Sequence, residues 1–118
     1  MDSVWTQTAQ MPKFEPLKGD LKTDILIIGG GIAGILCAHR LKNAGVDYAL
    51  VEANELCSGI TKNTTAKITS QHGLVYDKLS RKYGAEKALL YLNANQRAVE
   101  QYREMCREIE CDLQEQEF

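Results

Sequence analysis

The chain has 118 residues, of which 44% are hydrophobic and 25% charged, and its formal net charge is −2. This composition is typical of a globular protein and gives no reason to expect binding to nucleic acid or to an anionic membrane. The N-terminus lacks the pattern of a signal peptide, and the apolar run at residues 25–28 is far too short to span a bilayer, so we expect a cytoplasmic protein.

Residues 1–22 form a leader before the first predicted strand. Pro12 and Pro16 favour an extended backbone, while Trp5 and Phe14 offer aromatic surface. We expect part of this leader to pack on the body of the protein, although an unpacked tail is the more common fate of a terminus.

The most informative pattern begins at the first predicted strand, the apolar run Ile25–Ile28, which is typical of a parallel strand covered on both faces. The glycine-rich turn GGGIAG follows at residues 29–34, and then an apolar-periodic helix runs to about Ala44. A second strand, Val46–Val51, ends at Glu52. This order of elements is the βαβ dinucleotide-binding fingerprint.

Each glycine of the fingerprint has a physical role. Gly29 makes the tight turn out of the strand, Gly31 lacks the Cβ that would keep a pyrophosphate away, and Gly34 lets the helix pack close to the strand. The N–H groups near Ile32 and Ala33 meet the diphosphate at the positive end of the helix dipole.

The carboxylate of Glu52 lies where it can accept hydrogen bonds from the ribose hydroxyls of a dinucleotide. No arginine follows at Ala53-Asn54, so a 2′-phosphorylated cofactor is disfavoured. Gly45 is placed to end the helix in a left-handed conformation. The predicted sheet-facing stripe of that helix consists of Ile35, Leu36, Ala38 and Leu41.

Residues 53–73 are polar and rich in hydroxyl groups, which suits a loop and helix start that touch phosphate; an ordinary surface loop is the alternative. Helices are predicted from Leu74 to Lys82 and from Ala85 to about Cys111, separated by Gly84. The predicted apolar seam of the longer helix consists of Leu89, Leu92, Val99, Cys106 and Ile109.

The chain has four cysteines, no C-x-x-C motif and no paired histidines, so we expect reduced thiols and no metal site. Cys57 is the cysteine nearest the predicted cofactor, which leaves a redox role open. His72 precedes a glycine, a position more often occupied by a turn or packing residue than by a general base. The catalytic residues stay unassigned.

Length bounds the fold. A doubly wound domain usually needs about 150 residues, whereas this chain supplies only two confident strands before it becomes helical. We therefore expect an α/β fold in which residues 23–118 form an incomplete, truncated FAD-binding domain. It consists of a partial Rossmann-like βαβ unit (23–52), a cofactor loop (53–73) and a helical extension (74–112).

The motifs at residues 29–34, at Glu52 and at 64–67 (TTAK) resemble the N-terminal FAD-binding segment of D-amino-acid-oxidase-type FAD-dependent oxidoreductases. The leader around Trp5 and the stretch 64–73 are most similar to a bacterial branch that ends in a Rieske [2Fe-2S] domain. The resemblance implies FAD as cofactor, with any Rieske cluster in a C-terminal domain outside these residues. The residues expected to bind the cofactor are Gly29, Gly31, Ile32, Ala33, Gly34, Glu52, Ala53, Thr64, Thr65 and Ala66.

The resemblance further implies that Thr64, Thr65 and Ala66 approach the diphosphate and the flavin edge, and that Lys67 lies near the isoalloxazine. The predicted function is the FAD-binding part of an oxidoreductase that oxidises a small substrate by hydride transfer to the flavin and passes electrons to an acceptor. The alternatives are an NAD-binding dehydrogenase fragment and a non-catalytic βαβ binding module.

Overall fold

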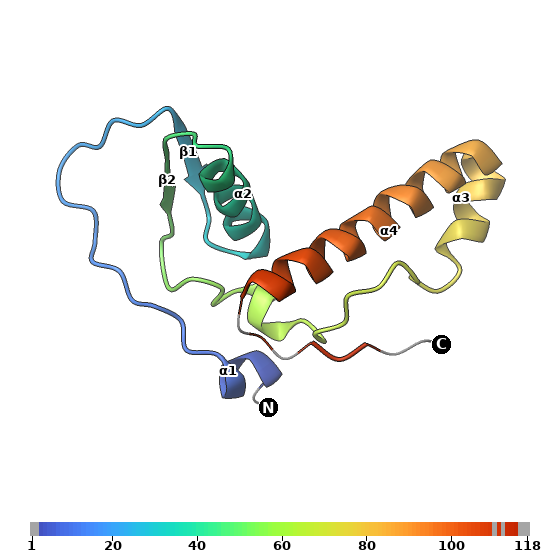
Figure 1. Cartoon of the computed structure of the whole chain (residues 1–118), viewed down its shortest axis with the longest axis horizontal. Coiled ribbons are helices and arrows are strands. Elements are labelled where there is room, and N and C mark those ends of the chain that lie inside the picture. Colours follow the sequence, from blue (N-terminus) through green and yellow to red (C-terminus); the bar gives the residue numbers. More distant parts are fainter. Residues whose placement is uncertain (1–2, 110, 112, 116–118) are drawn as a thin grey trace. The chain divides into compact units, whose positions relative to one another are not determined.

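The computed structural model describes residues 3–109, 111 and 113–115. The chain divides into two compact units, Met1–Ala66 and Lys67–Phe118, and the division lies inside the predicted cofactor loop. Figure 1 labels the elements of both units. In the part of the chain that the structure describes, no helix is both long enough and apolar enough to cross a membrane.

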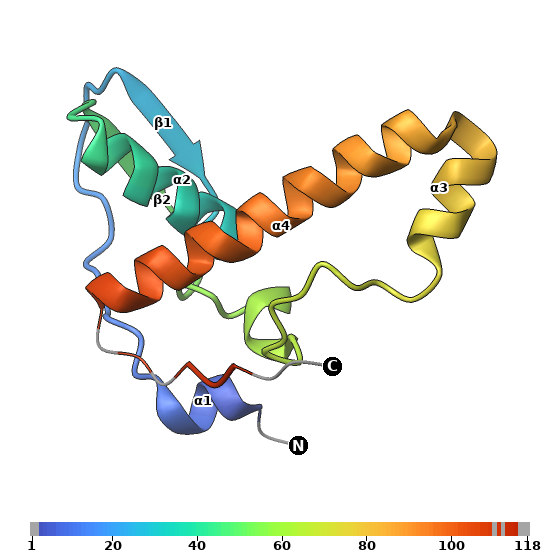
Figure 2. The same cartoon turned by 45° about the vertical axis from the view of Figure 1, so that its right-hand side comes forward.

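The first unit contains the predicted βαβ arrangement. Strands β1 (Ile25–Ile28) and β2 (Tyr48–Val51) pair in parallel, and helix α2 (Ile32–Asn43) connects them and packs on both (Figure 2). Strand β2 begins later than the predicted Val46, because the N–H of Val46 donates to the carbonyl of Leu41 and so belongs to the end of the helix. The order of elements and the parallel pairing are confirmed.

The expectation that β1 is covered on both faces is wrong for this unit. Ile27 is buried, whereas Leu26 is 54% and Ile28 is 82% exposed. The physical reason is that α2 is the only helix of this unit that packs on the strand pair among the described residues. The expected stripe of α2 is half-buried at Leu36, Ala38 and Leu41, but Ile35 is exposed.

The leader contains a short helix, α1 (Val4–Thr8), that the sequence did not predict. It packs against the 3₁₀ helix η1 (Ile60–Asn63), in Figure 1 the light-green turn beside the blue helix. The prolines lie in the irregular segment 9–22 that follows. Packing of part of the leader on the body is therefore confirmed.

The second unit is a pair of helices, α3 (Val75–Tyr83) and α4 (Ala85–Glu108), which pack against each other. Gly84 separates them with φ +88°, a conformation that favours glycine, so the predicted break is confirmed. Helix α4 ends earlier than the predicted Cys111, because Ile109 adopts an extended backbone.

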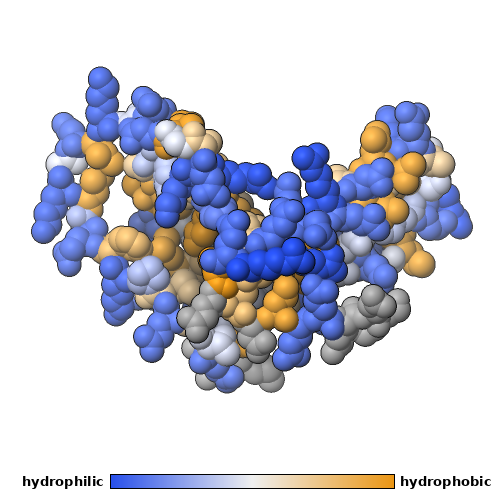
Figure 3. Space-filling model, viewed as in Figure 1, coloured by the Kyte–Doolittle hydropathy of each residue, from blue (hydrophilic) through white to orange (hydrophobic). Residues whose placement is uncertain are grey.

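The apolar seam predicted for α4 is wrong at two positions. Leu89 is 56% and Ile109 is 60% exposed, whereas Ala88 is buried. The rings of Tyr76 and Tyr91 lie 5.9 Å apart and join α3 to α4, so the contact face runs through Ala88 and Tyr91 rather than Leu89. Figure 3 shows that apolar and polar residues are mixed on one face of the molecule.

Candidate functional site

The turn that follows β1 is built on Gly29. Its φ of +106° lies in the region that favours glycine, and its N–H donates a 2.8 Å hydrogen bond to the carbonyl of Val51. The turn therefore leaves the strand pair at the point where β2 also ends. This geometry brings the glycines and the acid after β2 to the same edge of the sheet.

Gly34 makes the closest approach in the unit. A Cβ at this position would lie 2.0 Å from the carbonyl oxygen of Gly29 and 3.4 Å from a methyl carbon of Ile27. Helix α2 thus packs against the turn at a distance that no side chain permits. The role predicted for Gly34 in helix packing agrees with this geometry.

Gly31 precedes the first residue of α2 and has an extended backbone, with φ −79° and ψ −176°. A Cβ there would lie 3.3 Å from Oγ1 of Thr61, a tight contact. The loop thus approaches the backbone of residue 31 closely, through the Thr61 hydroxyl, on the side where a larger residue would carry its Cβ.

The carboxylate of Glu52 is held by the backbone. The N–H of Gly30 donates to Oε2 at 2.7 Å and the N–H of Asn54 donates to Oε1 at 3.0 Å. These N–H groups, that of Gly30 first, lower the pKa of Glu52 below its ordinary value of 4.5. An ionised carboxylate has further lone pairs. Glu52 can therefore accept hydrogen bonds from the hydroxyl groups of a ligand while its orientation stays fixed.

The N-terminus of α2 meets the loop through Thr61. The N–H of Ile32 donates to the Thr61 hydroxyl at 3.0 Å, and no side chain caps the helix from Gly31. The positive end of the helix dipole favours an anion or an oxygen acceptor at this place. A side-chain oxygen of the loop fills that role in the structure.

Cys57 anchors the loop to the glycine turn. Its N–H donates to the carbonyl of Gly30 at 2.9 Å, and its own carbonyl accepts from the N–H of Lys62 at 3.2 Å. Burial raises the pKa of the Cys57 thiol, which disfavours the reactive thiolate. Cys57 therefore has a structural role in the loop, and the redox role left open by the sequence stays a prediction.

The loop after η1 is fixed by the leader. The indole N–H of Trp5 donates to the Thr64 hydroxyl at 2.8 Å, and that hydroxyl donates to the carbonyl of Thr61 at 3.1 Å. Ala66 has φ +59°, an uncommon conformation for alanine, at the end of the first unit. Ala53, Thr65 and Ala66 are exposed.

All ten residues predicted to bind a cofactor belong to the first unit. The turn residues, the N-terminus of α2 and Glu52 meet at one edge of the strand pair, and the backbone of Gly30 links them. Four further participants are not in the predicted set: Trp5, Gly30, Asn54 and Thr61. Nothing in the sequence distinguishes Thr61 from the other hydroxyl residues of its loop.

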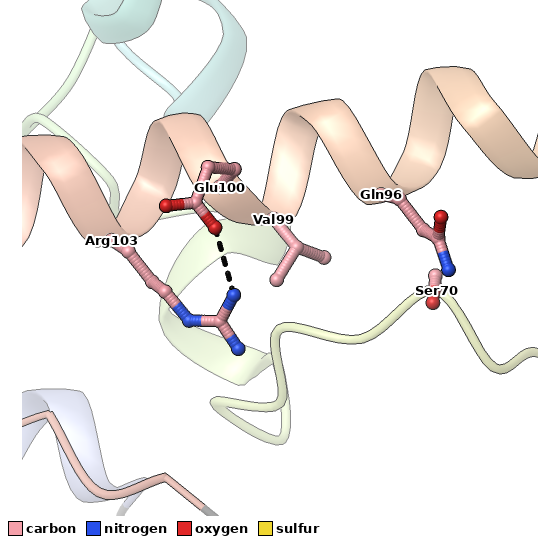
Figure 4. A pocket seen from close by; sticks show the side chains of 5 residues that line it. All are labelled: Ser70, Gln96, Val99, Glu100 and Arg103. Carbon is pink, nitrogen blue, oxygen red and sulfur yellow. Dashed lines mark hydrogen bonds and ion pairs between the residues drawn. The ribbon is translucent and has the colours of Figure 1, made fainter.

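The second unit contains a separate cavity of about 270 Å³, lined by Ser70, Gln96, Val99, Glu100 and Arg103 (Figure 4). Arg103 forms ion pairs with Glu100 at 2.9 Å and with Glu115 at 3.0 Å. Its hydrogen bond with Glu100 and the charge of Glu115 raise the pKa of Arg103. The guanidinium of Arg103 already pairs with two carboxylates. This cavity is therefore a weaker candidate site for an anionic ligand than the glycine turn.

The described residues contain no group of three or more His, Cys, Asp and Glu side chains placed to hold a metal ion. The cysteines Cys37, Cys57, Cys106 and Cys111 are free thiols in the structure. In the described part of the chain, the glycine turn with Glu52 is therefore the constellation that best suits a ligand.

A dinucleotide fits the residues present at that turn. The glycine backbone at residue 31, the positive end of α2 and an ionised, oriented carboxylate at Glu52 supply a phosphate cradle and a hydroxyl acceptor. These residues would hold the diphosphate and the adenosine ribose, respectively.

Comparison with known proteins is independent of this geometry. The model of the DAO family, described as FAD dependent oxidoreductase, matches residues 24–117. YhfW of Bacillus subtilis (strain 168), named as a Rieske 2Fe-2S iron-sulfur protein, is 39% identical over 118 residues, covering 98% of this chain and 23% of that protein. No solved structure matches the chain significantly.

Two enzymes are also similar. Gamma-glutamylputrescine oxidoreductase of Escherichia coli (strain K12) is 25% identical over 75 residues, covering 64% of this chain and 18% of that enzyme. Aerobic glycerol-3-phosphate dehydrogenase of Staphylococcus saprophyticus is 35% identical over 89 residues, covering 69% of this chain and 16% of that enzyme. The chain thus spans less than a quarter of the length of these relatives.

Proposed function

Because this chain belongs to the FAD-dependent oxidoreductase family, we propose that its first unit binds the ADP part of FAD in a Rossmann-like site. The observation that carries the proposal is the bond from the Gly30 N–H to Glu52, which joins the phosphate turn to the ribose acceptor. The N-terminus of α2 and Gly31 would receive the diphosphate. Thr64, Thr65 and Ala66 would continue the contact toward the flavin.

The proposed activity of the whole protein is the oxidation of a small substrate, with the bound flavin as hydride acceptor and a separate electron acceptor completing the cycle. The part played by these residues is to bind and orient the dinucleotide. Glu52 fixes the ribose through an ionised carboxylate, and the glycines let the backbone approach the diphosphate. The family assignment supports FAD over NAD, because the glycine turn alone suits both.

The absorption spectrum of the full-length protein as purified tests the cofactor. Flavin bands in the blue and near ultraviolet, released as FAD on denaturation, are the expected result. A protein without flavin that binds NADH tightly would contradict the proposal and favour the dehydrogenase alternative. A protein that binds neither dinucleotide would favour the non-catalytic module.

Anaerobic mixing with candidate substrates tests the reaction. The panel should include amino acids, amines related to gamma-glutamylputrescine and glycerol 3-phosphate, because two relatives carry the last two substrates in their names. Bleaching of the flavin by one class of compound, at a rate lowered when the transferred hydrogen is replaced by deuterium, is the expected result. Flavin that bleaches with none of them but only with a thiol or a nicotinamide reductant would contradict it.

We also propose that the full-length protein carries a Rieske [2Fe-2S] cluster outside these 118 residues. The support is the similarity to YhfW over 98% of this chain. Iron and acid-labile sulfide in equal amounts, with the electron paramagnetic resonance signal of a reduced Rieske centre, are expected. Flavin without iron would leave the FAD site in place and remove the cluster.

A further inference from the structure

A run of hydrogen bonds connects the leader helix to the candidate phosphate site. The Trp5 indole N–H donates to the Thr64 hydroxyl at 2.8 Å, the Thr64 hydroxyl donates to the Thr61 carbonyl at 3.1 Å, and the Ile32 N–H donates to the Thr61 hydroxyl at 3.0 Å. All four residues belong to the first unit. Trp5 and Thr64 are 59 positions apart, so this link is tertiary rather than local.

The Thr64 hydroxyl has a single proton, and its direction decides what the link can do. An indole N–H only donates, so Trp5 occupies an acceptor position of the Thr64 oxygen and leaves that hydroxyl's proton for the Thr61 carbonyl. The backbone N–H of Thr64 also points to this carbonyl, at 3.4 Å. Trp5 thus fixes the turn that ends η1 and, with it, the position of the Thr61 side chain.

The Thr61 hydroxyl lies at the place where the diphosphate is proposed to bind. It accepts the N–H at the start of α2, and it is the atom nearest to the position that a Cβ on residue 31 would take, at 3.3 Å. A hydroxyl both accepts and donates, so while the Thr61 oxygen accepts the Ile32 N–H, its own proton is left to donate to a phosphate oxygen. Thr61 therefore suits a direct contact to a diphosphate.

We propose that Trp5 is a positioning residue for the FAD site: through Thr64 it holds Thr61 at the diphosphate, so that the leader helix forms part of the cofactor site. This inference rests on the proposed FAD binding. Its physical basis is preorganisation, because a loop that is already ordered loses less conformational freedom when the ligand binds. Without the Trp5 bond, that loss lowers the affinity for FAD.

The test uses the full-length protein after removal of its FAD, titrated with FAD and followed by flavin fluorescence. Trp5→Phe keeps an aromatic ring and removes the N–H, and Thr64→Val keeps the shape and removes the hydroxyl. Each should raise the Kd for FAD about three- to tenfold, the size of one hydrogen bond. Thr64→Ser keeps the hydroxyl and should stay within about twofold of wild type. Phe14 is an exposed aromatic residue of the same leader. The variant Phe14→Leu is therefore the matched control and should bind FAD as the wild type does.

The double variant Trp5→Phe with Thr64→Val separates positioning from general loss of structure. If both residues act through one hydrogen bond, the Kd of the double variant for FAD should not exceed that of the single variant with the higher Kd. Additive losses, or an affinity unchanged in both single variants, would overturn the inference. A wild-type protein that fails to bind FAD would instead overturn the proposed function.

Trypsin cleavage of the leader supplies a second measurement. Binding and ordering are reciprocal, so FAD should slow cleavage after the exposed Lys13 and Lys18 in wild type. In Thr64→Val, where the link is broken, FAD should leave the cleavage rate unchanged. Equal protection in both proteins would show that the leader responds to FAD by another route and would contradict the role of Trp5.

Discussion

The backbone N–H of Gly30 donates a 2.7 Å hydrogen bond to Oε2 of Glu52, across 22 positions of sequence. Parallel pairing of Ile28 with Val51 brings the two residues to the same edge of the sheet. Because the N–H of Asn54 holds the other carboxylate oxygen at 3.0 Å, the carboxylate has a fixed direction before any ligand binds. The direction of the carboxylate that we propose as the ribose acceptor is therefore set by backbone N–H groups.

The first prediction concerns the charge of this acceptor. Glu52→Gln keeps the shape but replaces one acceptor oxygen by an amide N–H₂ group, which weakens the bonds to Gly30 and to the ribose hydroxyls. We expect the Kd for FAD to rise about tenfold. Glu55→Gln, at an exposed glutamate of the same segment, is the control and should leave the Kd unchanged. Equal Kd values for Glu52→Gln and wild type would remove Glu52 from the site.

The second prediction concerns pH. The pKa of Glu52 is lowered in the folded chain, so the native state binds fewer protons than the unfolded state near pH 4.5. The stabilisation is fully present above that pH and is lost as the pH falls through the lowered pKa. In urea unfolding, the gap in midpoint between wild type and Glu52→Gln should be constant from pH 7 to pH 5 and should shrink in more acidic buffer. A gap that grows in acid would contradict the assignment.

The third prediction concerns close packing at Gly34. An alanine Cβ would lie 2.0 Å from the Gly29 carbonyl oxygen, so Gly34→Ala forces backbone to move and should destabilise the protein by about 2 to 3 kcal/mol. Gly59→Ala is the matched control, because no atom lies within 4 Å of its Cβ position and its φ is −82°. Urea unfolding should show a loss for Gly34→Ala alone. Similar midpoints for the two variants would mean that α2 does not pack as described.

The fourth prediction separates binding from folding at Gly31. Its φ of −79° is accessible to any residue, so Gly31→Val should fold, while its side chain crowds Thr61 and fills the space over the start of α2. We expect the purified variant to retain little or no FAD and to keep the circular dichroism of the wild type. Gly59→Val should retain its flavin. A Gly31→Val protein with full flavin content would exclude the diphosphate from this place.

The fifth prediction concerns Cys57. Burial raises the pKa of its thiol, so little thiolate is present at neutral pH, whereas Cys37 is exposed. Iodoacetamide should label Cys57 more slowly than Cys37 in the folded protein, as measured by mass spectrometry of the peptides. Cys57→Ser should keep FAD binding. Faster labelling of Cys57 would instead indicate an activated thiol and favour a redox role.

The βαβ order could be predicted because its signals are local: a β-branched run, glycines at fixed spacing, and a helix that ends at Gly45, whose φ is +67°. The first and last residues of the helices and strands were harder to predict from the sequence. Whether Val46 belongs to the strand depends on a hydrogen bond to Leu41 that the amino-acid pattern does not encode. The error at Leu89 has a similar origin, because Tyr76 of the neighbouring helix decides which face of α4 is buried.

The candidate site could be predicted at its glycines and at Glu52, since their spacing carries the chemistry. The contacts of Thr61 and Trp5 could not. These contacts depend on the path of the loop and of the leader through space. The sequence does not show which of several hydroxyl residues in the loop will meet them. The role of Gly30 could not be predicted for another reason: it contributes a backbone N–H, which every residue except proline possesses.

The register of the strand pair limits which insertions and deletions this chain can accept during evolution. Ile28 stands opposite Val51, and Glu52 follows immediately. Side chains alternate between the faces of a strand, so deleting one residue within β2 would turn every later side chain of the strand to the other face. Substitutions along β2 can accumulate singly, but a single-residue insertion or deletion there separates Glu52 from Gly30 at once. Length variation among natural versions of this segment is therefore expected in the leader and the loop after Ala53, and not within β2.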